Sequence, residues 1–132
     1  MTQSVTVTLS LPPRALSPNS RPHWAAKAKA AKAHRGEAFL MTRHAMRQGQ
    51  VLDTTGAVLV RPSFFHRVNR RRDRDNATAS LKAALDGIAE ALGMDDSGFV
   101  VAPVRFFVDK KDVRVVLELE GLRGDATPSE TP

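Results

Sequence analysis

Apolar and polar residues alternate strictly near the start of the chain. Val5, Val7 and Leu9 take every second position between threonines and a serine, and Leu11 extends the series. A two-residue period places the apolar side chains on one face, which is typical of a half-buried β-strand. The following stretch, LPPRALSPNSRP, contains four prolines that interrupt regular structure. The pattern therefore predicts one strand and then an irregular segment.

An alanine-rich stretch over residues 22–48 predicts a long helix, and Pro22 suits its first turn. After the loop GQVLDTTG, we expect a second strand over residues 57–66. Pro62 lies inside that strand and has no backbone N–H to donate. Its presence favours an edge position or a bulge.

A second helix is predicted over residues 77–92. Its apolar residues recur at i, i+4, i+7 and i+11, which forms one stripe on a helix: Leu81, Leu85, Ile88 and Leu92. Asp75 or Asn76 can cap the start of this helix, and Gly93 can end it. The spacing therefore indicates a helix with one buried side.

Two further strands are predicted in FVVAPVRFFV and VRVVLELE, with a hairpin at DKKD between them. The last strand has one apolar face, formed by Val113, Val115, Leu117 and Leu119. The order β-α-β-α-β-β predicts an α+β fold in which two helices pack on one face of a small mixed sheet. We expect one domain over residues 1–120 and a flexible tail over residues 121–132, where no apolar pattern continues.

Composition narrows the class of protein further. A chain of 132 residues with 42% hydrophobic residues suits a single globular domain. The absence of cysteine excludes disulfides and thiolate zinc sites and suits a reducing compartment. The N-terminal stretch has no cationic start followed by an apolar block, and no apolar run approaches the length of a membrane span. We therefore expect a cytoplasmic protein with no membrane partner.

The charge distribution points to an anionic partner. The formal net charge is +6, from 20 lysines and arginines against 14 acidic residues. Basic residues crowd positions 21–74, whereas acidic residues gather mainly from position 73 onward. This asymmetry favours a nucleic-acid surface over a merely solvated helix and loop. The candidate DNA-contacting residues are Lys27, Lys29, Lys32, Arg35, Arg67, Arg70, Arg71, Arg72 and Arg74.

Two acidic pairs flank the second predicted helix. Asp73 and Asp75 precede it, and in an extended segment both side chains would project to the same face. Asp95 and Asp96 follow its far end. Because a helix of about 16 residues is roughly 24 Å long, the two pairs can meet only if the chain turns back.

Such a meeting would suit a divalent metal. Mg²⁺ prefers carboxylate oxygens and leaves positions for water and phosphate, and in phosphodiester hydrolysis it activates water and offsets charge on the phosphate. Lys82 and Asp86 stand four residues apart on the polar flank of the same helix. A purely structural alternative stays open at this point, because DxD pairs often cap helices and an i,i+4 pair is common on helix surfaces.

Three separated elements, RRRDRDN, LKAALDGI and GMDDSGF, together resemble the RusA family of Holliday junction resolvases, which is common in bacteriophages and prophages. The family pattern is an Asp-x-Asp-Asn motif, then a lysine and an aspartate one turn apart, then an Asp-Asp pair. The segment LSPNSRPHWAAKAKAAKAHR also resembles the start of phage-borne members, so the likeness covers most of residues 7–100. In one departure, more residues separate Asn76 from Lys82 than in the resolvase that gives the family its name.

The resemblance implies a Mg²⁺-dependent endodeoxyribonuclease in which Asp73, Asp75 and Asp96 bind the metal, with Mn²⁺ as a substitute. It implies Lys82 as the essential lysine, with Asp95 assisting. It also implies a homodimer that resolves four-way DNA junctions by paired nicks during recombination, repair or phage DNA processing. A phage-encoded chain would act in the cytoplasm of its bacterial host.

Two alternatives stay open: a catalytically silent DNA-binding module, and a single-strand or RNA-binding accessory protein. A shortage of aromatic residues, with no tyrosine, weighs against the second. We expect Trp24 to be a packing anchor or to stack on an exposed base. The four histidines are interpreted as surface or phosphate-contacting residues and four phenylalanines as core: His23, His34, His44, His66, Phe64, Phe65, Phe106 and Phe107.

Overall fold

The computed structural model describes residues 4–18, 21 and 23–122. Its strands are β1 (Ser4–Leu9), β2 (Val58–His66), β3 (Phe99–Val101), β4 (Arg105–Val108) and β5 (Arg114–Gly121). Its helices are η1 (Arg14–Leu16), α1 (Trp24–Arg47), α2 (Arg74–Ala79), α3 (Lys82–Leu92) and η2 (Asp96–Gly98), of which η1 and η2 are 3₁₀ turns. The α+β fold predicted from the sequence is confirmed.

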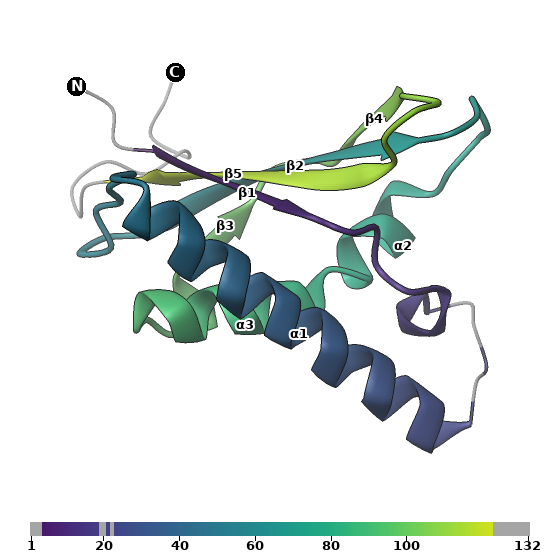
Figure 1. Ribbon diagram of the computed structural model, residues 1–132, viewed down its shortest axis with the longest axis horizontal. Helices are drawn as coiled ribbons and strands as arrows, with labels where there is room; N and C mark the ends of the chain where they lie inside the picture. The colour runs from purple at the N-terminus through teal and green to yellow at the C-terminus, as the bar shows by residue number, and fades with distance from the viewer. Residues whose placement is uncertain (1–3, 19–20, 22, 123–132) are drawn as a thin grey trace.

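The sheet is mixed and has five strands (Figure 1). β5 lies between β1 and β2 and runs antiparallel to both. On its other side, β2 pairs in parallel first with β3 and then with β4, so these two short strands form one interrupted edge. β2 is therefore an interior strand that receives partners along both sides.

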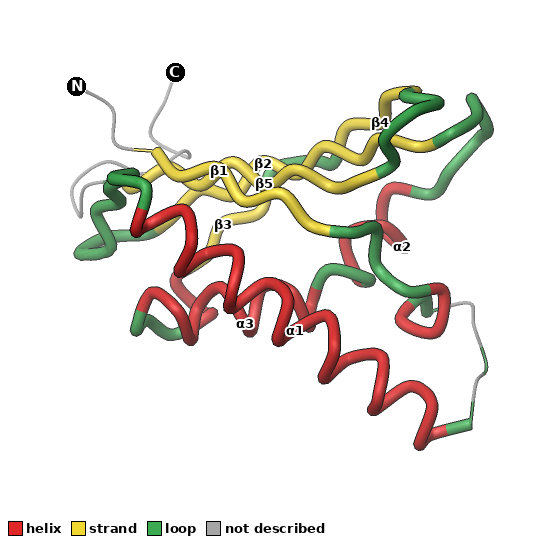
Figure 2. Tube along the Cα trace, viewed as in Figure 1, coloured by secondary structure: helices red, strands yellow, loops and turns green. Residues whose placement is uncertain are grey.

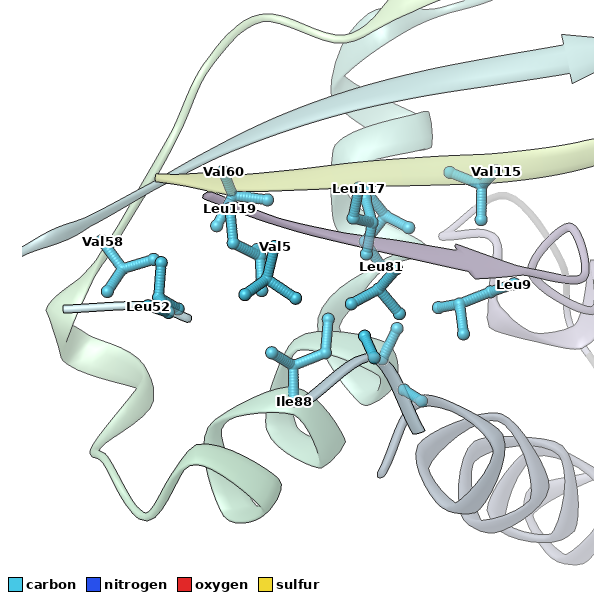
Figure 3. Packing of buried hydrophobic residues seen from close by; sticks show 14 of the residues in the cluster. Val5, Leu9, Leu52, Val58, Val60, Leu81, Ile88, Val115, Leu117 and Leu119 are labelled. Atoms are coloured by element: carbon cyan, nitrogen blue, oxygen red, sulfur yellow. The ribbon is translucent and has the colours of Figure 1, made fainter. Parts of the chain in front are cut away.

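Alternating residues of the strands form the core. Val5, Val7 and Leu9 of β1 are buried, as are Val115, Leu117 and Leu119 of β5. Together with β2 residues they cover the face of the sheet toward the helices (Figure 3). The alternation explains this arrangement, since every second side chain of a strand points to the same face.

Both long helices lie on that one face of the sheet (Figure 2). The stripe predicted on α3 is confirmed: Leu81 and Ile88 are fully buried, while Leu85 and Leu92 are partly buried against the core. Gly87 is also buried and lies against the backbone of Arg35 in α1. α1 and α3 therefore approach closely, which only a small residue permits at this point.

The predicted second helix is in fact two helices. α2 and α3 are separated at Ser80 and Leu81, where the Ser80 hydroxyl donates to the Ala77 carbonyl at 2.7 Å. The N-terminal cap is Asp73, not Asp75 or Asn76, because the Asp73 carboxylate accepts the Asn76 backbone N–H at 3.1 Å. The predicted end is confirmed, as Gly93 takes a left-handed conformation with φ of 69°.

The predicted hairpin at DKKD is wrong. β4 and β5 do not pair with each other, because β2 lies between them and pairs with both. The DKKD segment instead forms a turn in which the Asp109 carboxylate accepts the backbone N–H groups of Lys111 and Asp112. It carries the chain from one side of β2 to the other.

Pro62 lies in this interior strand, not at an edge. The carbonyl of Val60 accepts from Ala102, so the backbone groups of residues 60, 62 and 64 face the β3–β4 side. Pro62 stands opposite the break between Val101 and Arg105, where the neighbouring edge has one more residue than β2. Its missing N–H therefore falls where the ladder is interrupted, as at a bulge.

Two expectations fall partly outside the described residues. Pro22, which was expected in the first turn of the long helix, lies outside the described residues, and the helix begins at Trp24. The expected tail lies outside from residue 123, while Gly121 belongs to β5 and pairs with Val58. In the described part of the chain, no helix has the length and apolarity needed to cross a membrane.

Candidate functional site

Lys82, Asp86 and Asp96 lie together in a hollow of about 240 Å³, here named the acidic hollow, whose lining also includes Thr78, Leu85, Phe99 and Val101. The Lys82 ammonium lies 3.7 Å from Oδ1 of Asp86 and 3.8 Å from Oδ2 of Asp96. The two carboxylates also face each other closely. Hydrogen bonding to Asp86 and then to Asp95 raises the pKa of Asp96 above its ordinary value, against the opposing effect of Lys82.

The chain turns back to bring Asp96 to this place. Lys82 is the first residue of α3 and Asp86 follows one helical turn later. After α3 ends at Gly93, the Asp95 carboxylate caps η2 by accepting the Ser97 backbone N–H at 2.9 Å, which lowers the pKa of Asp95. The chain thus turns back, as a meeting of the two acidic pairs would require, and brings Asp96 beside Lys82 at the start of α3.

Asp73 and Asp75 do not share one extended face as expected. Asp75 lies in the first turn of α2, whereas Asp73 stands before the helix as its cap. Asp75 precedes Thr78 by three residues, so the two lie on the same side of α2. Thr78 lines the acidic hollow, whereas neither Asp73 nor Asp75 is among its lining residues.

A divalent metal can be tested against these donors. Within residues 4–18, 21 and 23–122, no three acidic or histidine side chains stand close enough to hold a metal ion. The carboxylates of Asp86 and Asp96 nevertheless flank Lys82 together, and carboxylate oxygens are the ligands that a hard cation prefers. The described residues thus place two carboxylates beside Lys82 and no third donor with them, so Mg²⁺ or Mn²⁺ binding stays a prediction.

A second, larger depression of about 320 Å³ lies on the other side of α2, and we name it the cationic cleft. One wall is the proline-rich segment of residues 11–14 and another is formed by Arg71 and Arg72. Phe64, His66 and Phe106 line it from the sheet. Asp73, Asn76, Ala77 and Ser80 line it from the α2 side, and Ser17 also belongs to the lining.

The nine basic residues expected to contact DNA are exposed, except that Arg72 is half-buried. Arg35 also donates to Glu90 of α3 at 2.9 Å and so links the two long helices. The first turns of α1, η1 and the β2–α2 connection lie toward the same end of the molecule (Figure 1). Part of the basic surface therefore lies toward one end of the molecule.

The sequence interpretation was wrong for some aromatic residues. Trp24 is 76% exposed and anchors nothing in the core. Phe64 is buried and Phe106 is partly buried against the core, as expected. Phe107 is 37% exposed and stacks on Phe65 with ring centres 5.0 Å apart, away from the core cluster.

His34 is not a surface residue, since only 2% of it is exposed. Burial lowers the pKa of His34, and Glu37, whose carboxylate lies 3.5 Å from Nδ1, acts in the opposite direction. Asp86 was anticipated only as the helix partner of Lys82. Its role as the carboxylate opposite Asp96 was missed, although the LKAALD spacing already placed it beside the lysine.

No family model matches the chain. It is 37% identical over 125 residues to an uncharacterized protein of Xylella fastidiosa (strain Temecula1 / ATCC 700964), across 95% of this chain and 82% of that protein. The chain belongs to the family of that protein. The match establishes kinship over nearly the whole length but names no activity, so the resemblance to resolvases stays a prediction.

Proposed function

We propose that this chain is a Mg²⁺-dependent endodeoxyribonuclease of the RusA type, which resolves four-way DNA junctions as a homodimer. The observation that carries the proposal is the approach of Lys82 to Asp96, which lie fourteen positions apart and meet at 3.8 Å. These are two of the residues that the resemblance assigns to the reaction. Their approach supports the proposal because it brings a cation for phosphate and a carboxylate for a metal into the same hollow.

The acidic hollow supplies the residues that would hold a divalent ion. Asp96 and Asp86 lie beside Lys82 there, and Asp75, which lies in the first turn of α2, would have to join them. A bound Mg²⁺ would activate water and offset the charge that builds on the phosphate. Asp73 is included among the proposed metal ligands only because of the family resemblance, since its carboxylate caps α2 in the structure.

Lys82 can hold a phosphate oxygen in this site. Its side chain is 77% exposed, and its ammonium has two carboxylates as partners at distances beyond a short hydrogen bond. A cation that engaged Asp86 and Asp96 would weaken those ion pairs and leave the ammonium available to a phosphate. The exposed arginines of the β2–α2 connection would position the DNA backbone without reading its sequence.

A homodimer fits the symmetry of the proposed substrate. Paired nicks in a two-fold symmetric junction require two sites related by a two-fold axis, which a dimer of identical chains supplies. Salt-sensitive binding to branched DNA would follow from the many phosphate contacts.

A nicking assay on a synthetic four-way junction tests the proposal. Asp75→Asn and Asp96→Asn should bind the junction as tightly as the unaltered chain and lose nicking in both Mg²⁺ and Mn²⁺. Glu118→Gln is the matched control, because Glu118 is an exposed acid of β5 that does not line the acidic hollow. Nicking by the Asp96→Asn protein at the rate of this control would refute the assignment.

A second candidate function is DNA binding without cleavage. It is favoured by one observation, namely that Lys82 pairs with both carboxylates and so offsets their charge without a metal. This candidate predicts that the unaltered chain binds junctions equally with and without divalent ions and never nicks them. Cleavage in Mg²⁺ that EDTA abolishes would exclude it.

A further inference from the structure

The cationic cleft is separate from the acidic hollow and has a different chemistry. Phe64, His66 and Phe106 form an aromatic cluster on its sheet side, with ring centres 5.9 Å apart between Phe64 and His66 and 6.0 Å apart between His66 and Phe106. Leu11 and the two following prolines line it from the N-terminal segment. The cleft therefore offers flat, largely apolar surfaces on two sides, which suits a planar group.

The histidine in this cluster is held neutral. Desolvation, and then the nearby guanidinium of Arg72, lower the pKa of His66 below its ordinary value of 6.5. A neutral ring at pH 7 stacks as an aromatic and does not repel the adjacent arginines. The cluster can thus accept a nucleobase face, as aromatic side chains do in many single-strand-binding proteins.

The rim of the cleft is suited to phosphate. Arg14, Arg71 and Arg72 all line it, and among its described lining residues Asp73 is the single acid. The Asp73 carboxylate already accepts the Asn76 backbone N–H, so part of its charge is engaged. The guanidinium groups can therefore attract an anion at the rim of the cleft.

The size of the cleft restricts the ligand. Its volume of about 320 Å³ is near the lower end of the range of roughly 300–1,000 Å³ found for small-molecule sites. It is too small for duplex DNA but adequate for one nucleotide. Because Asp73 lies at its border, a nucleotide held there would be next to the proposed metal-binding segment.

We propose that the cationic cleft holds one unstacked deoxynucleotide, with the base against Phe106 and His66 and the phosphate on Arg71 and Arg72. The inference rests on the proposed function for the source of the nucleotide, since a four-way junction opened at its crossover presents nucleotides that have lost a stacking neighbour. It adds a reason for structure selectivity, because continuous duplex keeps its bases stacked and would have to break pairing to fill the cleft.

The first test is binding of a fluorescent thymidine trinucleotide in EDTA, so that no cleavage is involved. Ala77→Phe places a ring inside the cleft and should weaken binding by about tenfold or more. Ala79→Phe is the matched control, because Ala79 is an exposed alanine of the same helix that does not line the cleft. Equal affinity of the two variants, with both folded by circular dichroism, would overturn the inference.

The second test uses the unaltered chain and so does not depend on how Ala77→Phe folds. A trinucleotide carrying 5-iododeoxyuridine at its centre is photo-cross-linked, and the attached peptide is identified by mass spectrometry. We expect attachment to Phe106 or His66. Attachment confined to Trp24 or to the outer pair of Phe65 and Phe107 would assign the unpaired nucleotide elsewhere and overturn the inference.

These readouts separate the two proposals. If the chain never nicks junctions but cross-links within the cleft, the nuclease proposal fails and the nucleotide site stands. If the Asp96→Asn variant loses nicking but the unaltered chain cross-links outside the cleft, the nuclease proposal stands and the nucleotide site fails.

Discussion

Gly87 lies where α3 crosses α1, and replacement by alanine tests that crossing. A Cβ atom at position 87 would lie far inside van der Waals contact with the Arg35 carbonyl oxygen, 3.1 Å from the carbonyl carbon and 3.2 Å from Cβ of Ala38. The Arg35 oxygen belongs to the backbone of α1 and cannot rotate away as a flexible side chain would. The two helices would therefore have to separate.

The expected loss of stability follows from two opposing contributions. Overpacking a well-packed core destabilises by about 1–3 kcal/mol, and a rigid backbone contact favours the upper end, about 3 kcal/mol. Alanine in place of glycine inside a helix returns about 1 kcal/mol. We therefore expect Gly87→Ala to lower the free energy of unfolding by about 2 kcal/mol, which corresponds to a fall in Tm of roughly 8 °C for a domain of this size.

Gly36 provides the matched control, because it is an exposed glycine of α1 at which an added Cβ meets nothing within 4 Å. Gly36→Ala should therefore raise the free energy of unfolding by up to about 1 kcal/mol. Urea unfolding followed by circular dichroism measures both variants against the unaltered chain. If Gly87→Ala proved as stable as Gly36→Ala, the close approach of the two helices would be wrong.

Three further predictions concern single side chains. Asp73→Ala should lower the free energy of unfolding by about 1 kcal/mol, whereas Asp73→Ser keeps a helix-capping oxygen and should lower it only slightly. If urea unfolding showed the same loss of stability for both variants, the capping contact would be contradicted. Because burial lowers the pKa of His34 below 6.5, the unfolded chain binds more protons as pH falls below that value, and stability should decrease there. His34→Gln should make the free energy of unfolding, measured in urea, fall less between roughly pH 7 and pH 5. An unchanged pH profile would mean that other groups cause the fall. Asp86→Asn should lower the pKa of Asp96, since Asp86 is the largest cause of its upward shift; carboxyl ¹³C NMR titration measures this, and an unmoved pKa would refute the contact.

The apolar pattern was sufficient to predict most local elements. The alternation in β1 and β5 and the leucine stripe of α3 reflect burial on one side, which a sequence records directly. The pairing of the strands was harder to predict. β2 and β5 pair across a long separation in the sequence, and no local pattern distinguishes that pairing from a hairpin at DKKD. The break at Ser80 and Leu81 was also missed, since the leucine stripe begins only at Leu81 and carries no information on the residues before it.

The candidate site could be predicted in part. The helical spacing of Lys82 and Asp86 fixes their proximity, because four residues make about one turn. The approach of Asp96 could not be foreseen, since it depends on the left-handed turn at Gly93 and the short η2 that follows. The prediction for Trp24 was wrong for a similar reason. Its apolar character suggests burial, but only the tertiary structure reveals that the first turn of α1 extends past the core and leaves this side chain exposed.

The position of β5 between β1 and β2 has a consequence for how the chain is made. β1 is synthesised early, yet its strand partner is β5, as the pairing of Val7 with Leu117 illustrates. During translation the first strand must wait, with Val5, Val7 and Leu9 uncovered, until nearly all described residues have left the ribosome. Contacts between such distant segments slow folding and leave apolar surface exposed to aggregation. Early release of a truncated product would thus leave a chain that cannot close its sheet.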